Sequence, residues 1–357
     1  MPTTALQPRQ IKGHRLWMPR RVLITPDALD SSYGQELNKG LTALGLPVEI
    51  MAQNRLTGLR GATERETYRI AKTTLAIVNA PPSQFRLQPI PPSADFQFHL
   101  AQGCPAHCQY CYLAGSLSGP PVIRVYANLP EILENLKHYV TPGRVTSFEA
   151  SCYTDPLALE HLTGGLSRTI SFFGQLPDAH LRFVTKFTNI APLLALDHHS
   201  HTRARISLNA PEIARLLEGG VLEIAARIAA LRQLALPKEQ GGGNYPVGIV
   251  LAPIIPIDNW QQAYGHLLDT ICSAIDFAPD VTFELITHRF TEGSREVLTG
   301  WYPNSSLDMT SEGRSKKLNK FGGTKYVFER GTMSALKDFF YREIAAKFPK
   351  AHILYWT

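Results

Sequence analysis

The sequence predicts an α/β fold in which a small N-terminal α/β domain precedes a partial (β/α)6 barrel of the TIM type. From residue 94 onward, strand-like apolar runs alternate with helix-like stretches, a pattern typical of a parallel sheet with crossover helices. Six such units favour an open, partial barrel over a closed barrel of eight. A stretch rich in proline separates these units from a shorter α/β segment that comes before them.

The N-terminal segment is expected to form its own domain over residues 1–85. Prolines at positions 81, 82, 89, 91 and 92 then indicate an extended linker, placed at residues 86–93, because proline and the residue before it resist helix formation. Residues 94–357 form the predicted barrel and a C-terminal hairpin region. In the first domain, the expected strands are Arg21–Thr25 and Pro47–Met51, and the expected helices are Ser31–Leu44 and Ala62–Val78.

Each barrel strand is predicted from a short apolar run, and each helix from a longer stretch between two such runs. The expected strands are Gln97–Gln102, Thr146–Ser151, Leu181–Lys186, Arg203–Leu208, Tyr245–Leu251 and Val281–Thr287. The expected helices are Pro130–Tyr139, Leu157–Phe173, Val221–Leu234 and Asn259–Phe277.

Composition excludes several classes of protein. With 357 residues, 44% hydrophobic and 18% charged, the chain can bury a full core and is neither disordered nor collagen-like. No apolar run approaches the length of a membrane span, and the first 25 residues lack the apolar core of a signal peptide. Five cysteines, an odd and sparse set, favour a reducing cytoplasm over a disulfide scaffold. The net charge of +6 is a mild bias toward a polyanionic partner.

Chemically useful side chains follow the predicted strands. In barrels of parallel strands, the chemistry takes place at the carboxyl ends of the strands. Cys104, Cys152, Lys186, Ser207 and His288 all lie at or just past such an end. The sequence therefore predicts that they meet at one mouth of the barrel.

Three cysteines within the string GCPAHCQYCYL form a C-x3-C-x2-C motif: Cys104, Cys108 and Cys111. Three thiolates on one loop suit a soft metal centre. A [4Fe–4S] cluster usually takes four cysteines, so three would leave one iron open for a substrate or cofactor. Zinc with His107 as fourth ligand is the alternative, although His107 lies inside the same short loop, where closing a tetrahedron is awkward. Three unrelated cysteines are the remaining alternative.

With Tyr110 just before its third cysteine, this motif resembles the signature of the radical S-adenosylmethionine (SAM) superfamily. Four further strings follow in order: FEASCYTD (148–155), THRF (287–290), PNSSLDM (303–309) and FGGTKYVF (321–328). Together they resemble the spore photoproduct lyase family, from about residue 15 to the C-terminus. The resemblance implies a partial barrel of the radical SAM kind, with SAM bound at the open iron and cleaved to a 5′-deoxyadenosyl radical. The family's reaction reverts 5-thyminyl-5,6-dihydrothymine in DNA to two thymines.

The resemblance also assigns roles to individual residues. Cys152 matches the hydrogen-atom donor of the family, whereas a lone cysteine without this context is more often a small buried hydrophobe. Tyr110 and Tyr112 match a tyrosine pair that relays the radical back, and Tyr110 would also pack near the adenine of SAM. The matching candidates for polar contacts to SAM are Thr154, Lys186, Ser207 and, more weakly, Asn209.

A basic segment near the C-terminus is the expected DNA interface. Cations interleave with aromatic residues there, phosphates favour such charge, and Gly322–Gly323 signals the turn of a β-hairpin. In the family, a hairpin in this region wedges into the duplex and helps to flip the lesion out. The chain departs from the family at Ser315 and Lys316, where an Arg–Tyr pair is expected, and this leaves the lesion itself open. The DNA-contacting candidates are Arg314, Lys316, Lys317, Lys320, Lys325 and Tyr326.

The expected partners are DNA that contains a thymine photolesion and a reductant of the flavodoxin or ferredoxin type. The protein is expected to act as a cytoplasmic monomer without membrane contact. Two other interpretations stay open: a radical SAM enzyme acting on a different nucleic acid or small molecule, and a zinc-stabilised DNA-binding protein without catalysis.

Overall fold

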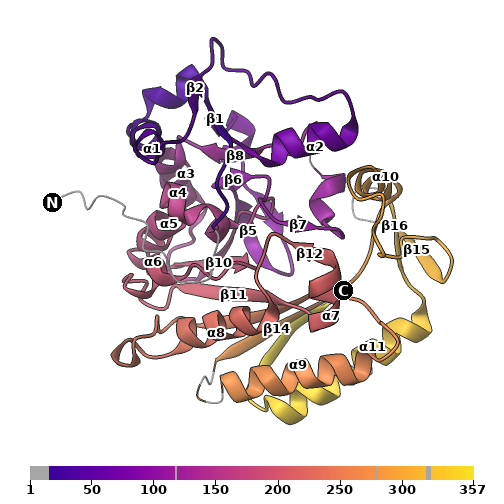
Figure 1. The fold of residues 1–357 in the computed structure, drawn as a ribbon. Coiled ribbons are helices and arrows are strands. Elements are labelled where there is room, and N and C mark those ends of the chain that lie inside the picture. Colours follow the sequence, from indigo (N-terminus) through magenta and orange to yellow (C-terminus); the bar gives the residue numbers. More distant parts are fainter. Residues whose placement is uncertain (1–15, 117–118, 276, 278–279, 319–322) are drawn as a thin grey trace.

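The computed structural model describes residues 16–116, 119–275, 277, 280–318 and 323–357. Its main feature is a curled eight-stranded sheet with the order β17-β14-β13-β11-β10-β9-β5-β4 (Figure 1). Neighbouring strands from β5 to β17 run parallel, and only the edge strand β4 is antiparallel. The strands are β4 (Gln88–Ile90), β5 (Ala94–Phe98), β9 (Thr146–Ala150), β10 (Ala179–Thr185), β11 (Thr202–Leu208), β13 (Val247–Ile254), β14 (Val281–Thr287) and β17 (His352–Trp356).

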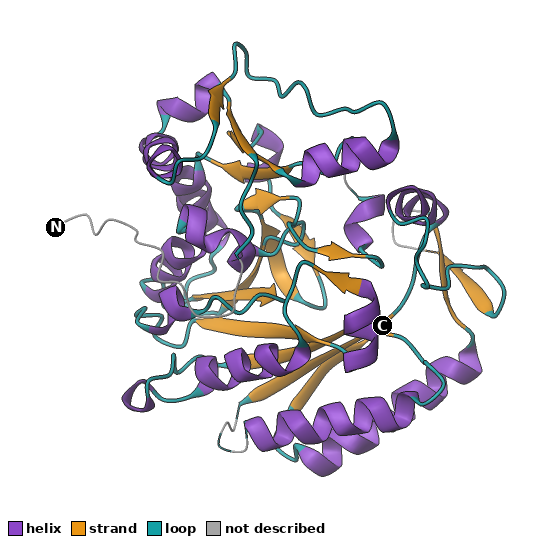
Figure 2. Ribbon diagram, in the orientation of Figure 1, coloured by secondary structure: helices purple, strands orange, loops and turns teal. Residues whose placement is uncertain are grey.

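Helices connect the parallel strands and cover the outer face of this sheet, where α8, α9 and α11 lie side by side (Figures 1 and 2). Phe148, Ile206 and Phe283 point to that face and are fully buried. The helices are α3 (Leu129–Leu136), α4 (Glu160–Thr163), α5 (Gly165–Gly174), α6 (Ala191–Leu194), α7 (Pro211–Leu217), α8 (Ile224–Ala235), α9 (Trp260–Ala274), α10 (Glu292–Trp301) and α11 (Arg330–Lys347). No helix within the described ranges is both long and apolar enough to cross a membrane.

A second sheet, with the order β2-β1-β3-β8-β6, contains the N-terminal strands. Its fourth strand, β8, comes from the chain after the cysteine motif, so residues 1–85 do not complete this sheet alone. The division into domains stays a prediction, and the proline-rich stretch contributes β4 to the large sheet. The elements are β1 (Arg21–Ile24), α1 (Ser32–Ala43), β2 (Val48–Ile50), α2 (Glu64–Lys72), β3 (Thr74–Val78), β6 (Ala101–Gln102) and β8 (Ile123–Tyr126).

Three predicted elements differ from the structure. The helix expected over Ala62–Val78 ends at Lys72, and the apolar run after it is strand β3. The strand expected over Gln97–Gln102 is divided between β5 and β6, which lie in different sheets, because β5 pairs with β9 of the large sheet and β6 pairs with β8 of the second sheet. The helix expected over Leu157–Phe173 is broken at Gly164, whose φ of 60° is left-handed.

The other predicted barrel strands lie in the large sheet with ends shifted by a few residues. The structure adds a seventh parallel strand, β17, that the sequence did not predict. The run His352–Trp356 is short and partly exposed at the sheet's edge, so its apolar pattern is weak.

Candidate functional site

The cysteine loop, defined here as residues 103–111, lies at the carboxyl ends of the parallel strands and is fixed by backbone contacts. Cys108 lies in the two-residue strand β7 (His107–Cys108), which pairs antiparallel with β12 (Glu218–Gly219). At the start of the loop, Gly103 has a φ of 78°, and a Cβ there would lie 2.5 Å from the carbonyl oxygen of Val122. Only glycine fits this position, so the loop's path depends on it.

All three cysteines of the motif lie close together, with Cys108 buried and Cys104 and Cys111 partly buried. Burial raises the pKa of the Cys104 thiol to about 12, and it raises the pKa values of Cys108 and Cys111 as well. The positive charge of Lys72 acts against this for Cys104 and Cys111, and Lys186 does so for Cys108. Without a metal these thiols stay protonated, and a soft metal centre would stabilise their thiolate forms.

Lys72, on α2 of the N-terminal part, fastens the cysteine loop. Its ammonium group donates hydrogen bonds to the carbonyl oxygens of Cys104 and Ala106, and the residue is only 7% exposed. The sequence indicates no role for Lys72, because a lysine in a polar helix carries no signal of a partner that lies more than thirty positions away.

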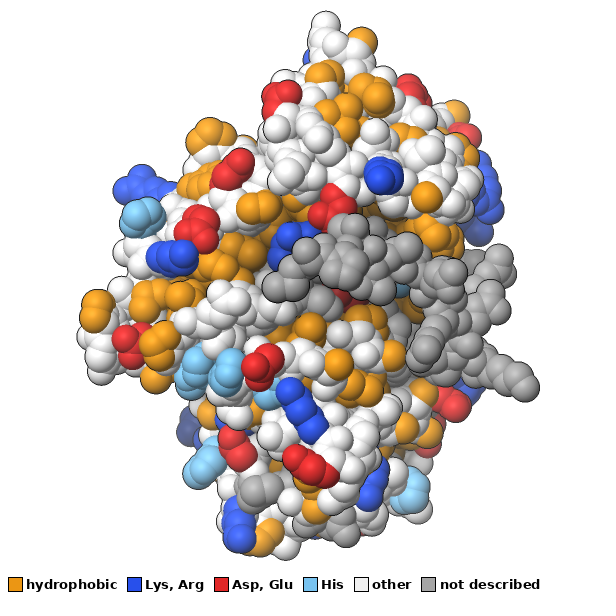
Figure 3. Space-filling model, turned by 90° about the vertical axis from the view of Figure 1, so that its left-hand side faces the viewer, with side chains coloured by type: hydrophobic (Ala, Val, Ile, Leu, Met, Phe, Trp, Pro, Cys, Tyr) orange, Lys and Arg blue, Asp and Glu red, His pale blue; other side chains and the backbone are white. Residues whose placement is uncertain are grey.

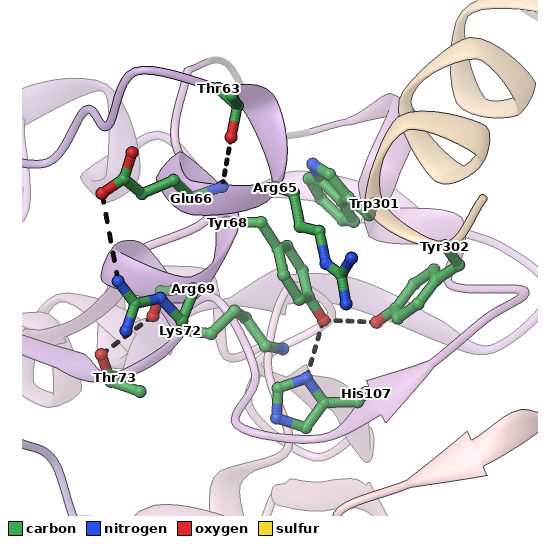
Figure 4. A pocket seen from close by; sticks show the side chains of 10 residues that line it. All are labelled: Thr63, Arg65, Glu66, Tyr68, Arg69, Lys72, Thr73, His107, Trp301 and Tyr302. Carbon is green, nitrogen blue, oxygen red and sulfur yellow. Dashed lines mark hydrogen bonds and ion pairs between the residues drawn. The ribbon is translucent and has the colours of Figure 1, made fainter. Parts of the chain in front are cut away.

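His107, the proposed fourth ligand of a zinc ion, faces an aromatic pocket behind the loop (Figure 4). Its Nδ1 atom lies 2.8 Å from the hydroxyl of Tyr68, which also contacts the hydroxyl of Tyr302. Among the described residues, no three Cys, His, Asp or Glu side chains surround one point as ligands of a single ion would. A [4Fe–4S] cluster does not require that arrangement, since its cysteines bind different irons, and the three thiols therefore fit a cluster by their chemistry and placement.

This pocket has a volume of about 570 Å³. Burial, together with the nearby charge of Lys72, lowers the pKa of His107 to about 4, so its imidazole is neutral at pH 7. The pocket is lined by Thr63, Arg65, Glu66, Tyr68, Arg69, Lys72, Thr73, His107, Trp301 and Tyr302.

A charged network centred on Glu218 adjoins the cysteine loop on its other side. Glu218 accepts hydrogen bonds from Tyr110 and, at 2.9 Å, from the ammonium of Lys186, and its second oxygen lies 2.6 Å from Arg227. Burial alone would raise the pKa of Glu218, but the charges of Lys186 and Arg227 outweigh it and lower the pKa to about 2. Lys186 also donates to the hydroxyl of Ser207 at 3.0 Å.

The structure thus brings together three residues that the sequence predicted at the cofactor site: Tyr110, Lys186 and Ser207. The Lys186 ammonium lies 5.6 Å from the centre of the Tyr110 ring. Glu218 and Arg227, which hold these groups in place, were not predicted from the sequence. Nothing in the string around Glu218 marks it, because its importance arises from the pairing of β12 with β7.

Thr154 and Asn209 are occupied with backbone groups. The Thr154 hydroxyl donates to the carbonyl of Gly103 and so supports the start of the cysteine loop. The Asn209 amide donates to the carbonyl of Pro253 at 2.8 Å, and its oxygen accepts from the hydroxyl of Tyr264 at 2.8 Å. Neither side chain is free to turn toward a ligand without losing these bonds, so both fix the local backbone.

Cys152 lies two residues past the end of β9, after Ser151, whose φ of 57° turns the chain sharply at the strand end. Burial raises the pKa of the Cys152 thiol, and the nearby carboxylate of Glu149 adds to the effect. The thiol is therefore fully protonated at neutral pH.

A buried ion cluster lies beside Cys152, on the sheet face turned away from the helices. Arg205, 2% exposed, is bonded to Glu149 and binds Glu284 through contacts of 2.8 and 2.9 Å. Gly248 leaves room for this arginine, since a Cβ there would lie 2.8 Å from its Cγ atom. Glu149 and Arg205 of this cluster contribute to the electrostatic surroundings of Cys152.

Tyr110 and Tyr112 lie in different environments. Tyr110 is largely buried against Glu218, whereas Tyr112 is 67% exposed. Tyr112 and Cys152 both lie close enough to Tyr153 to raise the pKa of its hydroxyl, after the larger effect of burial. Tyr153 is thus near both the cysteine after β9 and the exposed Tyr112, which follows the cysteine loop.

The predicted hairpin is present as β15 (Arg314–Leu318) and β16 (Thr324–Phe328), on the right-hand side of Figure 1. Lys316, Lys317 and Leu318 are exposed, and Lys317 stands directly opposite Lys325. Lys320 lies outside the described residues.

Two predicted DNA contacts point inward instead. Arg314 stacks on Phe328, with 3.8 Å between its guanidinium and the ring centre, and donates to the carbonyl of His288 at 3.2 Å. Tyr326 is 6% exposed and bonds Glu292 at 2.5 Å, so its ring is not presented to a base. Both residues anchor the hairpin to the body of the protein.

The face on the opposite side from the hairpin is different in character. Figure 3 shows that face, where basic and acidic side chains are interspersed. The lysines of the hairpin, by contrast, have no carboxylate within ion-pair distance among the described residues.

Comparisons with known proteins are consistent over nearly the whole chain. The family model described as spore photoproduct lyase matches residues 17–357. The spore photoproduct lyases of Geobacillus sp. (strain Y412MC61) and Bacillus subtilis (strain 168) are each 35% identical over 346 residues, which cover 96% of this chain and 99% of theirs. The spore photoproduct lyase of Clostridium acetobutylicum is 30% identical over 340 residues, which cover 95% of this chain and 98% of that relative.

Solved structures agree in fold. A spore photoproduct lyase complexed with dinucleoside spore photoproduct superposes with a TM-score of 0.90 at 33% identity, covering 96% of this chain and all of that one. A mutant of such a lyase with bound AdoMet and dinucleoside spore photoproduct gives the same TM-score, identity and coverage.

Proposed function

Because the chain belongs to the spore photoproduct lyase family, we propose that it is a radical SAM DNA-repair lyase acting on a thymine photolesion. In this proposal the protein reverts the spore photoproduct, 5-thyminyl-5,6-dihydrothymine, to two thymines. The family match supports the reaction. The protonated thiol of Cys152 supports its last step on the lesion, the donation of a hydrogen atom.

Cys104, Cys108 and Cys111 are proposed to hold a [4Fe–4S] cluster that leaves one iron open for SAM. The bound cluster and SAM together supply a 5′-deoxyadenosyl radical, which is chemistry that protein side chains cannot perform. The chain's own residues hold the site in place. Lys72 fixes the cysteine loop, and Glu218 fixes Tyr110 and Lys186 beside it.

Lys186 and Ser207 are the proposed polar contacts to SAM. Their side chains already form one hydrogen-bonded unit, so a ligand would meet them in a fixed geometry and lose little entropy on ordering them. Thr154 and Asn209 are proposed as positioning residues, because their polar atoms bind backbone groups.

Cys152 is the proposed hydrogen-atom donor. Removal of a hydrogen from C6 of the lesion lets the methylene bridge break by β-scission, and this leaves a thymine radical. A hydrogen atom then moves from the sulfur of Cys152 to the methylene carbon, so that a methyl group and a thiyl radical result. A donor of this kind must keep its proton, and the raised pKa of Cys152 ensures that it does.

Tyr112 and Tyr110 are proposed to reset the thiyl radical. A hydrogen atom moves from a tyrosine hydroxyl to the Cys152 sulfur, which restores the thiol and leaves a tyrosyl radical. The closeness of Tyr153 to both Cys152 and Tyr112 supports a short path for this transfer. Tyr110, bonded to Glu218 and close to Cys108, lies within the cysteine loop, and Tyr112 follows the loop directly.

The exposed lysines of the hairpin are proposed to bind the DNA backbone, because the phosphates supply the counter-charge that these lysines lack. We expect a reductant of the flavodoxin or ferredoxin type, and we expect the enzyme to act as a monomer in the cytoplasm. The direct test is anaerobic incubation of the reduced, reconstituted protein with SAM and the dinucleotide photoproduct. Chromatography should then show the thymine dinucleotide.

A different lesion or nucleic acid is the second candidate substrate. It rests on Ser315 and Lys316, which stand where an Arg–Tyr pair is expected and are exposed on the hairpin. If the protein cleaves SAM but leaves the dinucleotide photoproduct intact, this second candidate replaces the first.

A further inference from the structure

A second cavity, of about 670 Å³, lies on the N-terminal sheet. It shares no lining residue with the Glu218 network or with the three cysteines of the loop. Thr25 follows β1, Asn79 follows β3, and Tyr126 ends β8, and all three line the cavity. It therefore opens at the carboxyl ends of three neighbouring parallel strands.

The order of these strands places the cavity at a reversal in the direction of the chain's crossover connections. After β1, the chain places β2 on one side and then crosses to place β3 on the other. The gap between β1 and β3 is a topological switch point, which is where open parallel sheets commonly bind nucleotides and other ligands. The cavity's volume also falls in the range of small-molecule sites.

The outer wall of the cavity is built firmly. It consists of the loop after β2, where Leu59 is buried against Leu23 and its neighbours. Arg21 donates to the carbonyl of Gly58, and Asn54 accepts from the backbone of Asp27 at 3.0 Å. These contacts hold the loop over the sheet, where its residues line the cavity.

The charge of the cavity is one-sided. Three arginines line it, Arg55, Arg60 and Arg124, against a single acid, Asp27. Arg124 is partly buried, and no acidic side chain of the described chain forms an ion pair with it. Burial accordingly lowers its pKa. A desolvated guanidinium without a partner is unfavourable, and a bound anion would remove that cost.

Two residues that line the cavity also have acceptor oxygens that are unpaired within the described part of the chain. Asp27 and Asn79 each have a buried side-chain oxygen that finds no hydrogen-bond donor among the described residues. Hydroxyl groups of a ligand could supply such donors. The cavity thus offers cations for phosphate and acceptors for hydroxyls.

We propose that this cavity is a binding site for a phosphate-bearing small molecule of nucleotide size, held chiefly by Arg124 with Arg55 and Arg60. One guanidinium group can donate two parallel hydrogen bonds to a phosphate, and three guanidinium groups suit a diphosphate. Asp27 and Asn79 bind the hydroxyls of its sugar. The site is separate from photolesion repair and does not depend on that assignment.

The test is calorimetric titration of the holoenzyme with ADP and with pyrophosphate, in the presence of saturating SAM to exclude binding at the SAM site. The Arg124→Met variant should bind ADP at least tenfold more weakly. Its unliganded melting temperature should be unchanged or higher, because an unpaired, partly buried charge is removed. A purely structural arginine would instead lower the melting temperature. Lys39→Met, on the exposed side of α1, is the control and should bind ADP normally.

Three results would overturn the proposal. Absence of binding by both ADP and pyrophosphate would do so, and so would equal ADP affinity in the Arg124→Met variant. The third is displacement of ADP by an undamaged DNA duplex, which would identify the anion as DNA backbone phosphate instead. Photoproduct turnover is measured separately and should be the same with and without ADP. The ADP titration itself does not use the photoproduct, so a failure of the lyase assignment would leave the measured ADP affinity unchanged.

Discussion

Charged side chains surround the cysteine loop and also occur on the β15–β16 hairpin, but the two sets differ in burial and in pairing. Around the loop, Lys72, Lys186 and Glu218 are largely buried and every one has a partner. On the hairpin, Lys316 and Lys317 are exposed, and Lys317 stands opposite another lysine. Like charges directly opposite each other on two strands are destabilising, so this arrangement suits a partner that brings negative charge.

The difference matches two tasks, orienting a cofactor and binding a polyanion. Groups that orient a cofactor must keep their geometry before it arrives, and burial with full pairing achieves this. Groups that bind a polyanion gain by staying hydrated and unpaired until they meet it. Substitutions in the two regions should therefore have effects of different kind and size.

The largest effect is expected at the loop. The Cys108→Ala variant should lose most of its iron and visible absorbance and all of its SAM cleavage, because no further cysteine of the described chain is placed to replace the ligand. Cys272→Ala is the matched control: this thiol lies on α9, donates to the carbonyl of Lys347, and should be dispensable. Full iron content in Cys108→Ala would contradict the cluster assignment.

A smaller but still large effect is expected for Glu218→Gln. The change leaves Lys186 and Arg227 buried without their carboxylate, which should cost about 3–5 kcal/mol in the free energy of unfolding. Activity should fall roughly 10- to 100-fold, as for other residues that hold a cofactor site in place. Urea unfolding and SAM cleavage are the measurements, and Glu239→Gln, at an exposed position, is the control.

The same carboxylate predicts a pH dependence. Its pKa is about 2 in the folded protein, below the ordinary value of 4.5, so the ionised form favours folding. This contribution is fully present above pH 4.5 and is lost as the pH falls from there toward 2. Glu218→Gln should lack that part of the acid dependence, and an unchanged acid profile would mean that the network does not stabilise the fold.

The smallest effect on chemistry is expected at the hairpin. Replacing Lys316 and Lys317 together by alanine should weaken DNA binding and flatten its salt dependence, by about 0.9 in the slope for each phosphate that is no longer neutralised. Adding Lys320→Ala should flatten the slope further. Repair of the isolated dinucleotide should not change. Lys337→Ala on α11 is the control, and a salt slope that the hairpin changes do not alter would place the DNA interface elsewhere.

The sequence predicted the two regions to different depths. The spacing of Cys104, Cys108 and Cys111 is local, so the loop's chemistry could be inferred from it directly. Glu218 and Lys72 could not be found, because their roles come from a strand pairing and a packing contact between distant segments. The hairpin itself was predicted from its turn, but not the inward direction of Arg314 and Tyr326, which depends on Phe290, His288 and Glu292 beneath it.

The parallel sheet was predictable for the same reason. Most of its strands are buried apolar runs that can be recognised one at a time, as in Leu181–Thr185 with its alternating burial. The division between β5 and β6 and the edge strand β17 could not be found in this way, because pairing with other strands decides both.

The central claim is that Cys152 gives its hydrogen atom to the opened lesion, and the most direct test is a product chromatogram of Cys152→Ala with a count of 5′-deoxyadenosine per lesion opened. The variant should keep its cluster, cleave SAM and break the lesion bridge, since none of these steps needs the thiol. The thymine radical should then be trapped by dithionite-derived species, so that adducts replace the thymine dinucleotide and more SAM is consumed per lesion. Clean repair at the unmodified rate with unchanged SAM consumption would contradict the account and leave Cys152 as only a buried thiol.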